Sequence, residues 1–500
     1  ILPRTEHEKD RKAIQLINTK IIYKILGTLL FIEVSLMLWC LIVAFFYHED
    51  DVPAFIISII VTALGGIVLK YLGHNADNNL SRRDAYFVVS LAWVVFSLFG
   101  TMPYIIGGYI SNFTDAFFET MSGFSTTGAT ILNDVEVLPH GILFWRSLTQ
   151  WIGGLGIVFF TIALLPSMVG GSTKIFAAEA TGPIRTKLHP RLSMSAKWLW
   201  AVYITITLAC MGCYLLCGMD WYEAINFAMT SAATGGFAIY NDSIQHFHSP
   251  LMEYVSTFFC FISGVSFTLL YFSAAKLKFR ELFRNTEFRF YFLSVAVCSL
   301  CIMYTLMMQC GYEMERAFRS ALFQVVSFIT TTGYFNDDAG AWPHLTWVVL
   351  ALCMFSGACS GSTSGGLKSI RLVMLLKIVS NEFRQILHPT AVLPLKINAI
   401  NVPQQKRVTL LAFLVCYLML VAVMTFVMVM FGIEGADAIS ITFSSIGNVG
   451  PALGSSIGPI MSWDGLPDAA KWLSAIMMLI GRLEIFSVLI IFTPAFWKEN

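Results

Sequence analysis

Charged residues are scarce in this chain of 500 residues: Asp, Glu, Lys and Arg make up 13% of it, whereas 56% is hydrophobic. Soluble domains contain about 25% charged residues, so this chain cannot cover a water-facing surface with charge. The shortage excludes an ordinary soluble protein and favours one whose solvent is membrane lipid. Apolar runs such as Val408–Phe431 exceed the roughly 18 residues that mark a spanning helix. The net charge of +1 says little about partners, and we expect no nucleic acid among them.

The cysteine and histidine residues also lack the spacing of a metal site, a disulfide framework or a catalytic cluster. The 11 cysteines lie almost wholly in apolar runs, where free cysteine packs as a small buried side chain. No disulfide framework, redox motif or metal-ligand spacing is indicated. The 9 histidines are mostly peripheral and form no convergent cluster with acids, so an enzyme is not expected. The residues up to Lys24 are polar and basic, without the short apolar core of a cleaved signal peptide.

Four short segments of Thr and Gly recur at intervals of roughly 100 residues, each between two long apolar stretches. Each follows a short amphipathic stretch that has an acid near its start. We expect two leading helices, about 21–47 and 53–72, and then four copies of one unit: long helix, short helix, glycine loop, long helix. The four segments are Thr126-Thr127-Gly128, Thr234-Gly235-Gly236, Thr331-Thr332-Gly333 and Asn448-Val449-Gly450.

These repeats predict an all-α integral membrane protein, with four pseudo-repeated helix–pore-helix–loop–helix units around one pore and two leading transmembrane helices. We expect ten spanning helices in all. The predicted parts are 1–78 for a basic N-terminal segment and the leading helices, 79–192 for the first unit, 193–284 for the second, 285–400 for the third with an intramembrane loop at 356–367, and 401–500 for the fourth.

Positive charge is distributed unevenly along the chain. Of the 32 Lys and Arg residues, all lie in segments expected on one side except Arg146, Arg316, Arg319, Lys471 and Arg482. The positive-inside rule makes that side, with the N-terminus, cytoplasmic. The glycine loops then enter from outside, where the connections are acidic. An acidic mouth raises the local cation concentration, and external loops also carry acids simply because they are solvated; both explanations can hold.

The glycine loops have a chemistry suited to cations. An ion that crosses a membrane exchanges its hydration water for other oxygens, and rings of backbone carbonyls supply them. Glycine reaches the conformations that aim carbonyls inward at close range, and threonine adds hydroxyls. Each short helix would point its partly negative C-terminus at the pore. The alternative, a Gly/Thr helix-packing motif, does not predict a short helix before every loop.

A second polar feature interrupts the third unit. Gly357–Gly366 is so rich in Gly and Ser that it cannot form a stable helix. Broken helices in transporters usually line the pathway, and an ordinary polar kink is the alternative. Arg482 lies between Lys471 and Lys498 at a distance that places it near mid-membrane, where a charge is a functional hypothesis by default. It could instead pair with Glu484 or with a helix carbonyl.

In combination, these motifs resemble the Trk/Ktr/HKT superfamily of potassium transporters, and within it the bacterial TrkH type. The resemblance covers nearly the whole chain and also rests on residues 151–157 (WIGGLGI), 357–371 (GACSGSTSGGLKSIR) and 481–497 (GRLEIF and TPAFW). In that family each loop gives one glycine to a potassium filter, which maps to Gly128, Gly236, Gly333 and Gly450. Some sodium-preferring plant relatives have a serine at the first position, so Gly128 implies potassium. The implied K+ site comprises Thr126, Thr127, Gly128, Thr234, Gly235, Gly236, Thr331, Thr332, Gly333, Asn448, Val449 and Gly450.

The resemblance also implies a gate and a partner. The family's intramembrane loop obstructs the pore beneath the filter, and an arginine there adds an electrostatic barrier. The implied gate residues are Gly357, Gly361, Ser362, Thr363, Ser364, Gly365, Gly366, Lys368, which could face the inner cavity, and Arg482. The family works as a homodimer in the bacterial inner membrane on a ring of nucleotide-binding subunits of the TrkA type. The basic segments 174–197 and 276–289 are candidate docking surfaces or simple topology determinants.

Two transport mechanisms follow from these observations. The first is potassium uptake through a channel-like pore with a four-loop filter, gated by the intramembrane loop and by a cytosolic nucleotide-binding partner; the chain itself has no nucleotide site, because the glycines of Gly153–Gly156 lie within an apolar span. The alternative is a proton- or sodium-coupled potassium symporter that works by alternating access. Such coupling needs carboxylates on spanning helices, and the sequence offers few: Glu33, Glu253 and Glu484.

Overall fold

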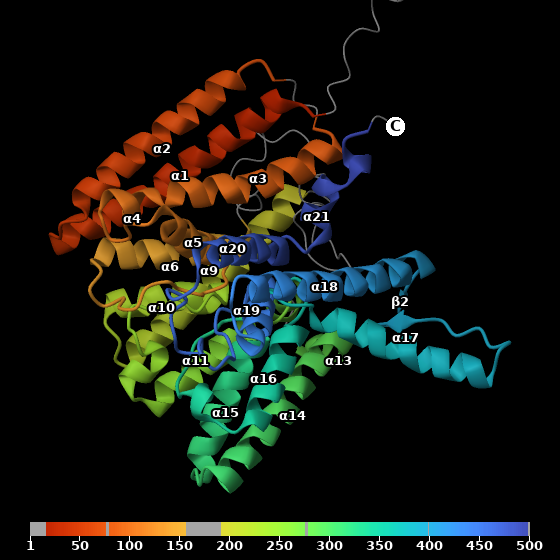
Figure 1. Cartoon of the computed structure of the whole chain (residues 1–500). Helices are drawn as coiled ribbons and strands as arrows, with labels where there is room; N and C mark the ends of the chain where they lie inside the picture. Colours follow the sequence, from red (N-terminus) through yellow and green to blue (C-terminus); the bar gives the residue numbers. More distant parts are fainter. Residues whose placement is uncertain (1–16, 77–79, 157–191, 276–278, 399, 499–500) are drawn as a thin grey trace, which may run out of the picture.

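The computed structural model describes residues 17–76, 80–156, 192–275, 279–398 and 400–498. Over these residues the chain is helical apart from one short antiparallel hairpin, in which β1 (Lys396–Ile397) pairs with β2 (Ile400–Asn401). The leading helices α1 (Thr19–Tyr47) and α2 (Val52–Leu72) pack against each other along one side of the molecule (Figure 1). The predicted all-α class is confirmed.

Within the described residues, 6 helices are long and apolar enough to cross a membrane, and up to 8 if each of two bent helix pairs forms one span. The expected total of ten included two further segments. One was 143–165, which runs past Gly156 and out of the described residues, and the other is the second helix of the third unit, which is divided. Large apolar side chains on the outer faces of the spans, such as Phe46, Leu64 and Phe426, suit contact with lipid.

After α2, the order of long helix, short helix, loop and second helix occurs four times. In the first unit the long helix is α3 (Arg82–Gly100) with α4 (Met102–Ile106), the short helix is α5 (Phe113–Phe124) and the second helix is α6 (His140–Leu155). The second unit has α9 (Leu192–Leu216), α10 (Trp221–Ala233) and α11 (Pro250–Ser263) with α12 (Phe267–Ala275) in these places, and the third, which α13 (Phe279–Arg284) precedes, has α14 (Thr286–Gln309), α15 (Met314–Ile329) and α16 (His344–Ser356) with α17 (Ser369–Leu387). The fourth unit has α18 (Gln404–Met430), α19 (Gly435–Gly447) and α20 (Asp468–Arg482) with α21 (Phe486–Leu489). Short 3-10 helices complete the described chain: η2 (Ser243–Phe247), η3 (Ala339–Ala341), η4 (Ile490–Phe492) and η5 (Pro494–Phe496).

The helix contacts close the four units into a ring. Each short helix packs on the two long helices of its own unit and on the second helix of the unit before it: α10 on α6, α15 on α11, and α19 on α16. The first short helix, α5, packs on α20 of the fourth unit. Because the last unit thus contacts the first, the four short helices surround a common centre.

Local sequence determines how the short helices are oriented. The side chain of Asn112 caps α5 by accepting from the backbone N–H of Thr114 at 3.0 Å, and Asp220 with Glu223 forms a capping box on α10. The other two short helices begin directly after Glu313 and Glu434. Acids and amides stabilise helix N-termini. All four starting residues are exposed, whereas the C-terminal ends are buried, so the partly negative ends of the helices point inward.

The second helix of three units bends or breaks below the glycine loops. The axis turns by 101° between α11 and α12 and by 107° between α20 and α21. In the third unit the break is Gly357–Lys368, here called the α16–α17 loop, one residue later than the predicted 356–367. Beyond it, α17 and the β1–β2 hairpin extend outward from the ring (Figure 1).

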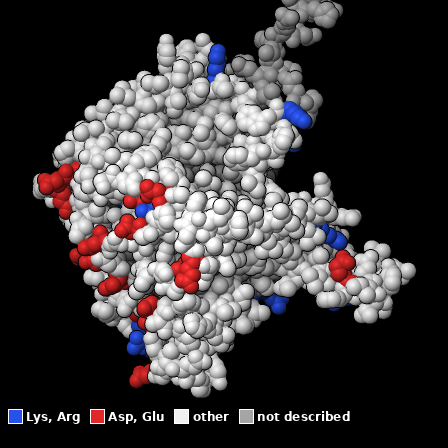
Figure 2. Space-filling view, in the orientation of Figure 1, with Lys and Arg blue, Asp and Glu red and all other residues white. Residues whose placement is uncertain are grey.

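Charge is segregated between two ends of the molecule. Figure 2 shows most acidic side chains along one margin, and most Lys and Arg side chains at the opposite end and on the α17 extension. The exposed acids Asp134, Asp242, Glu434 and Asp464 lie in connections that flank the short helices, whereas the exposed bases Lys70, Arg280, Arg384 and Lys396 lie in α2, α13, α17 and β1. The assignment of the basic end to the cytoplasm stays a prediction.

Candidate functional site

The four loops leave their short helices with the same backbone conformation. The residue two positions before each key glycine has a left-handed φ: 54° at Thr126, 50° at Thr234, 58° at Thr331 and 53° at Asn448. The next residue donates its N–H to a carbonyl five residues back: Thr127 to Ser122 (2.9 Å), Gly235 to Thr230 (2.9 Å), Thr332 to Ser327 (2.8 Å) and Val449 to Ser444 (2.9 Å). This hydrogen bond is the Schellman closure of a helix C-terminus. Four different sequences therefore build one turn.

The four glycines face the carbonyl oxygens of neighbouring loops. Their φ values lie between 82° and 96°, a region that favours glycine. A Cβ added to Gly128 would lie 2.1 Å from the oxygen of Gly235, one on Gly236 would lie 1.9 Å from that of Thr332, one on Gly333 would lie 2.5 Å from that of Val449, and one on Gly450 would lie 2.5 Å from that of Thr127. Each glycine thus meets the residue before the glycine of the next loop, and the fourth loop meets the first.

This closed series of contacts among Gly128, Gly236, Gly333 and Gly450, here called the glycine ring, brings carbonyl oxygens from all four units together. It has no space for side chains at the glycines, and the surrounding helix ends add partial negative charge. Such an arrangement suits a cation that has lost its hydration water. The oxygens that face the glycines are backbone carbonyls. Among the described residues, no group of His, Cys, Asp and Glu could hold a metal ion.

Hydroxyl groups brace the first and third loops. Thr127 Oγ1 lies 2.7 Å from Ser125 Oγ and accepts from Asn448 Nδ2 at 3.0 Å, and Thr332 Oγ1 lies 2.8 Å from Thr330 Oγ1. The sequence suggested that threonine hydroxyls extend the oxygen cage. In the structure these two hydroxyls bond to side chains of their own loops and, for Thr127, to Asn448 of the fourth loop.

A buried ion pair that the sequence analysis missed links the first two loops. Arg146 on α6 donates from Nε to Glu119 Oε1 at 2.9 Å and from Nη1 to the carbonyl of Ala238 at 2.9 Å. Its guanidinium lies 4.2 Å from the centre of the Phe237 ring. Glu119 in turn accepts from the N–H of Ile131 at 3.1 Å. An arginine within an apolar span, opposite an acid on the short helix before it, is the signal that could have revealed this pair.

The α16–α17 loop lies directly against the inner ends of the short helices. Thr363 Oγ1 donates to the carbonyl of Ala232 at 3.1 Å, at the end of α10. The N–H of Gly365 donates to Thr331 Oγ1 at 2.7 Å, and the N–H of Gly366 donates to the carbonyl of Gly447 at 2.9 Å. The loop therefore contacts the second, third and fourth units at the base of the glycine ring.

Arg482 at the end of α20 connects the α16–α17 loop to the first unit. Its Nη1 donates to the carbonyl of Thr363 at 2.8 Å, and its Nη2 donates to the carbonyls of Gly153 and Gly154 at 2.6 Å each. Carbonyl partners were one of the alternatives that the sequence left open for this residue. Glu484, the other suggested partner, binds Arg371 Nη2 at 2.5 Å.

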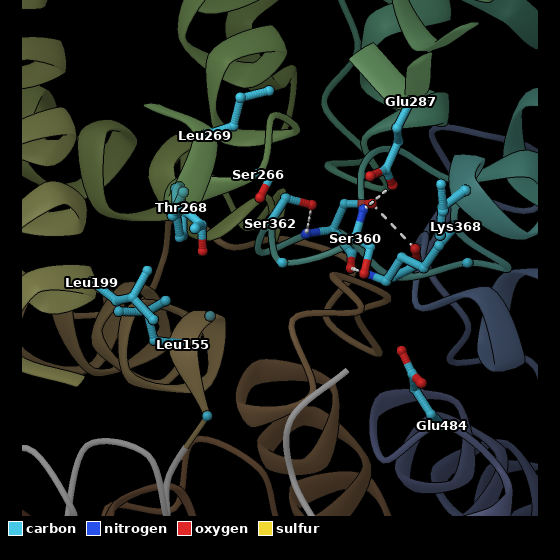
Figure 3. A pocket seen from close by; sticks show the side chains of 18 of the residues that line it. Leu155, Leu199, Ser266, Thr268, Leu269, Glu287, Ser360, Ser362, Lys368 and Glu484 are labelled. Carbon is cyan, nitrogen blue, oxygen red and sulfur yellow. Dashed lines mark hydrogen bonds between the residues drawn. The ribbon is translucent and has the colours of Figure 1, made fainter. Parts of the chain in front are cut away.

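A cavity of about 330 Å³ adjoins the α16–α17 loop. Figure 3 shows its polar wall with Ser360, Glu287 and Lys368, and its apolar wall with Leu155 and Leu199. The N–H of Ser360 donates to Glu287 Oε1 at 2.5 Å, and Lys368 Nζ donates to the carbonyl of Ser364. Lys368, expected near an inner cavity, lines this one. The sequence analysis missed Glu287, whose signal was an acid at the start of a spanning helix beside a basic cluster.

The predicted filter residues of all four loops meet at the glycine ring, and the predicted gate residues lie in the α16–α17 loop beneath it or, for Arg482, against it. The basic segments 174–197 and 276–289 fall partly or largely outside the described residues, so the docking prediction for them has no structural counterpart.

An all-α protein with several spans, whose loops present backbone carbonyls at its centre, belongs to the class of multi-pass membrane transport proteins. The sequence matches the TrkH family, described as "Cation transport protein", over residues 51–499, and the chain belongs to that family. It is therefore a transport protein and not an enzyme, as the sequence predicted.

Individual relatives agree with this assignment over nearly the full chain. The Trk system potassium uptake protein TrkH of Halomonas elongata is 34% identical over 484 residues, which cover 96% of this chain and 100% of the relative. The protein of the same name from Escherichia coli K12 is 33% identical, with 96% and 99% covered. The crystal structure of the potassium transporter TrkH from Vibrio parahaemolyticus superimposes with a TM-score of 0.87 at 31% identity, covering 96% of this chain and 99% of that one.

Proposed function

We propose that this protein takes up potassium across a bacterial inner membrane through the ring of four glycine loops. The observation that carries the proposal is the closed series of contacts in which each glycine meets the carbonyl of the next loop. Carbonyl oxygens can replace the hydration shell of K+, and the names of the relatives support potassium as the ion. The filter then consists of the three residues that end at Gly128, Gly236, Gly333 and Gly450 in each loop.

The α16–α17 loop is the gate of this pathway. Its hydrogen bonds to Ala232, Thr331 and Gly447 hold it at the base of the ring, and Arg482 places a positive charge beside it. A fixed positive charge in a region of low dielectric constant repels a passing cation. The loop and Arg482 together thus oppose the passage of K+ in the conformation described.

A cytosolic, nucleotide-binding partner opens the gate, and two copies of the chain form the working unit. The segregation of charge (Figure 2) supports a cytoplasmic side that carries the N-terminus and the α17 extension. That side is also where the α16–α17 loop continues into α17, so a partner that binds there would be connected to the gate through the chain.

Coupled symport remains the second candidate because of one residue. Glu33 is fully buried in the middle of α1, and within the described residues neither carboxylate oxygen has a hydrogen-bond partner. An isolated carboxylate in a spanning helix is what a proton-coupled mechanism needs. The other two acids are engaged: Glu253 binds Arg319 at 2.7 Å and Glu484 binds Arg371. Because only one of these three carboxylates is isolated in the part of the chain that the structure describes, and the other two are paired with arginines, the channel-like mechanism is favoured over coupled symport.

Cation flux into liposomes that contain the purified protein tests the proposal. We expect K+ and Rb+ to pass much faster than Na+ and Li+, a Gly128→Ser variant to lose this preference, and deletion of 361–365 to raise the basal flux. Equal passage of K+ and Na+ by the wild type would contradict the four-loop filter. Flux that requires an imposed proton gradient, and that Glu33→Gln abolishes, would instead establish the symporter.

A further inference from the structure

One of the four loops differs at the position immediately before its key glycine. That position holds Thr127, Thr332 and Val449 in the first, third and fourth loops, but Gly235 in the second. Gly236 has a positive φ, whereas the backbone of Gly235 lies outside the left-handed region. Backbone conformation therefore does not require glycine at 235, and the reason for the missing side chain must be space.

The side-chain amide of Gln150 occupies that space. A Cβ added to Gly235 would lie 2.3 Å from Gln150 Oε1 and 2.4 Å from its Cδ. Gln150 comes from α6 of the first unit and is completely buried. The amide of one unit thus fills the position that a side chain of the next unit has left open.

Gln150 also binds the backbone on both sides of Gly236. Its Nε2 donates to the carbonyl of Gly235 at 2.7 Å, and its Oε1 accepts the N–H of Phe237 at 3.0 Å. The carbonyl of Gly235 is the oxygen that faces Gly128 in the ring. Two successive glycines form the most flexible backbone a chain can have, and these two hydrogen bonds fix it.

The hydroxyls of Thr127 and Thr332 provide the corresponding support in their own loops, through Ser125 and Thr330. In the second loop no side chain at 235 can do this, so the support comes from outside the loop. Thr127 and Thr332 are the residues whose carbonyls face a neighbouring glycine, and Gln150 binds the corresponding carbonyl of Gly235 directly.

We propose that Gln150 is a positioning residue for ion selectivity: its amide replaces the side chain that Gly235 lacks and fixes the Gly235 carbonyl in the ring. The inference rests on the proposed function, because it assumes that the ring discriminates between cations. Selectivity between ions of different radius depends on how firmly the oxygens are held and how many there are. Loss of the amide therefore relaxes the preference for K+ over Na+ before it stops the flux.

The test measures the K+/Na+ flux ratio of five variants in liposomes. Gln150→Ala and Gln150→Met both lower the ratio, by roughly tenfold for the loss of hydrogen bonds to one loop, and Met keeps the volume of the side chain. Gly235→Thr alone also lowers the ratio, because the new side chain collides with Gln150. The double variant Gln150→Ala/Gly235→Thr reproduces the arrangement of the first and third loops and recovers a ratio above that of either single variant. Ser147→Ala is the matched control, since its hydroxyl donates to Leu143 of its own helix.

The possible outcomes separate the inference from the function on which it rests. A wild-type ratio in both Gln150→Ala and Gln150→Met overturns the inference. A double variant that is folded, as shown by its thermal melting, yet no more selective than the single variants, also overturns it. Recovery in the double variant supports it, because a merely structural role for Gln150 would not restore selectivity through a threonine. Equal passage of K+ and Na+ by the wild type would overturn the proposed function and the inference with it.

Discussion

Replacing Arg482 by alanine should raise the basal potassium flux. The bond from its Nη1 to the carbonyl of Thr363, at 2.8 Å, ties the α16–α17 loop to α20. A hydrogen bond to a charged group contributes about 1.5–3 kcal/mol. If the bond exists only while the loop is in place, its loss shifts the closed-to-open ratio by roughly 10- to 150-fold, because about 1.4 kcal/mol corresponds to tenfold. Arg482 is half-buried, and water weakens such bonds, so we expect the lower end, about tenfold.

The assay is Rb+ or K+ flux into liposomes in the absence of any partner, compared at equal amounts of folded protein. Arg482→Lys separates two causes, because lysine keeps the charge but lacks the planar fork that binds Thr363 and Gly153 together. A flux like the wild type in this variant would assign the effect to charge, and a flux like that of Arg482→Ala would assign it to the lost bonds. Arg316→Ala, which removes an exposed arginine, is the control. Wild-type flux in Arg482→Ala would refute the argument.

Three further predictions test the glycine ring, the Glu119–Arg146 ion pair beside it and Asp51 between α1 and α2. Gly236→Ala places a Cβ 1.9 Å from the oxygen of Thr332 and should abolish selective flux, whereas Gly212→Ala, with nothing within 4 Å, should leave it unchanged; equal behaviour of the two would contradict the ring. Glu119→Gln leaves the charge of Arg146 buried without its counter-ion and should cost about 3–5 kcal/mol of stability, visible as a lower melting temperature, while Glu119→Asp should lose less. Burial, and then the charge of Glu49, raise the pKa of Asp51, between α1 and α2, to about 6, so its contribution to stability is present below about pH 4 and is lost as the pH rises through 6. Asp51→Asn should therefore raise the melting temperature at pH 7.5 relative to the wild type by more than at pH 4, and a difference that does not change with pH would count against this assignment.

The four glycines can be singled out in the sequence because backbone geometry demands a particular residue type there, and their role as a filter stays a prediction. A φ near 83° at Gly128 or Gly333 penalises every residue with a Cβ, so the requirement is written in the amino-acid type. The lengths of the apolar runs likewise predicted the 6 unbroken spans among the described residues, since a helix must be long enough to cross the lipid. These features are local, and a single chain displays them without any knowledge of its neighbours.

Contacts between units could not be predicted in the same way. Nothing in the sequence says that the oxygen of Gly235 faces Gly128, because this depends on the order of the units around the ring. In the sequence, Gln150 is one polar residue in an apolar run. Its proposed role can be inferred only from the structure, where its amide lies next to Gly235, which has no side chain. The 107° turn after α20 is a further case: Glu484 and Ile485 have φ values of 56° and 48°, and neither residue type predicts such a conformation.

The asymmetry of the four units has a physical reason in the α16–α17 loop. One segment can cover the base of a ring of four similar loops, provided that this segment contacts every unit. The loop bonds to the second unit at Ala232, the third at Thr331 and the fourth at Gly447. It reaches the first unit through Arg482, which holds Thr363 on one side and Gly153 on the other. If each unit carried such a loop, four segments would compete for the same space beneath the ring. One long loop is therefore enough, and the second helices of the second and fourth units bend at short breaks instead, between α11 and α12 and between α20 and α21.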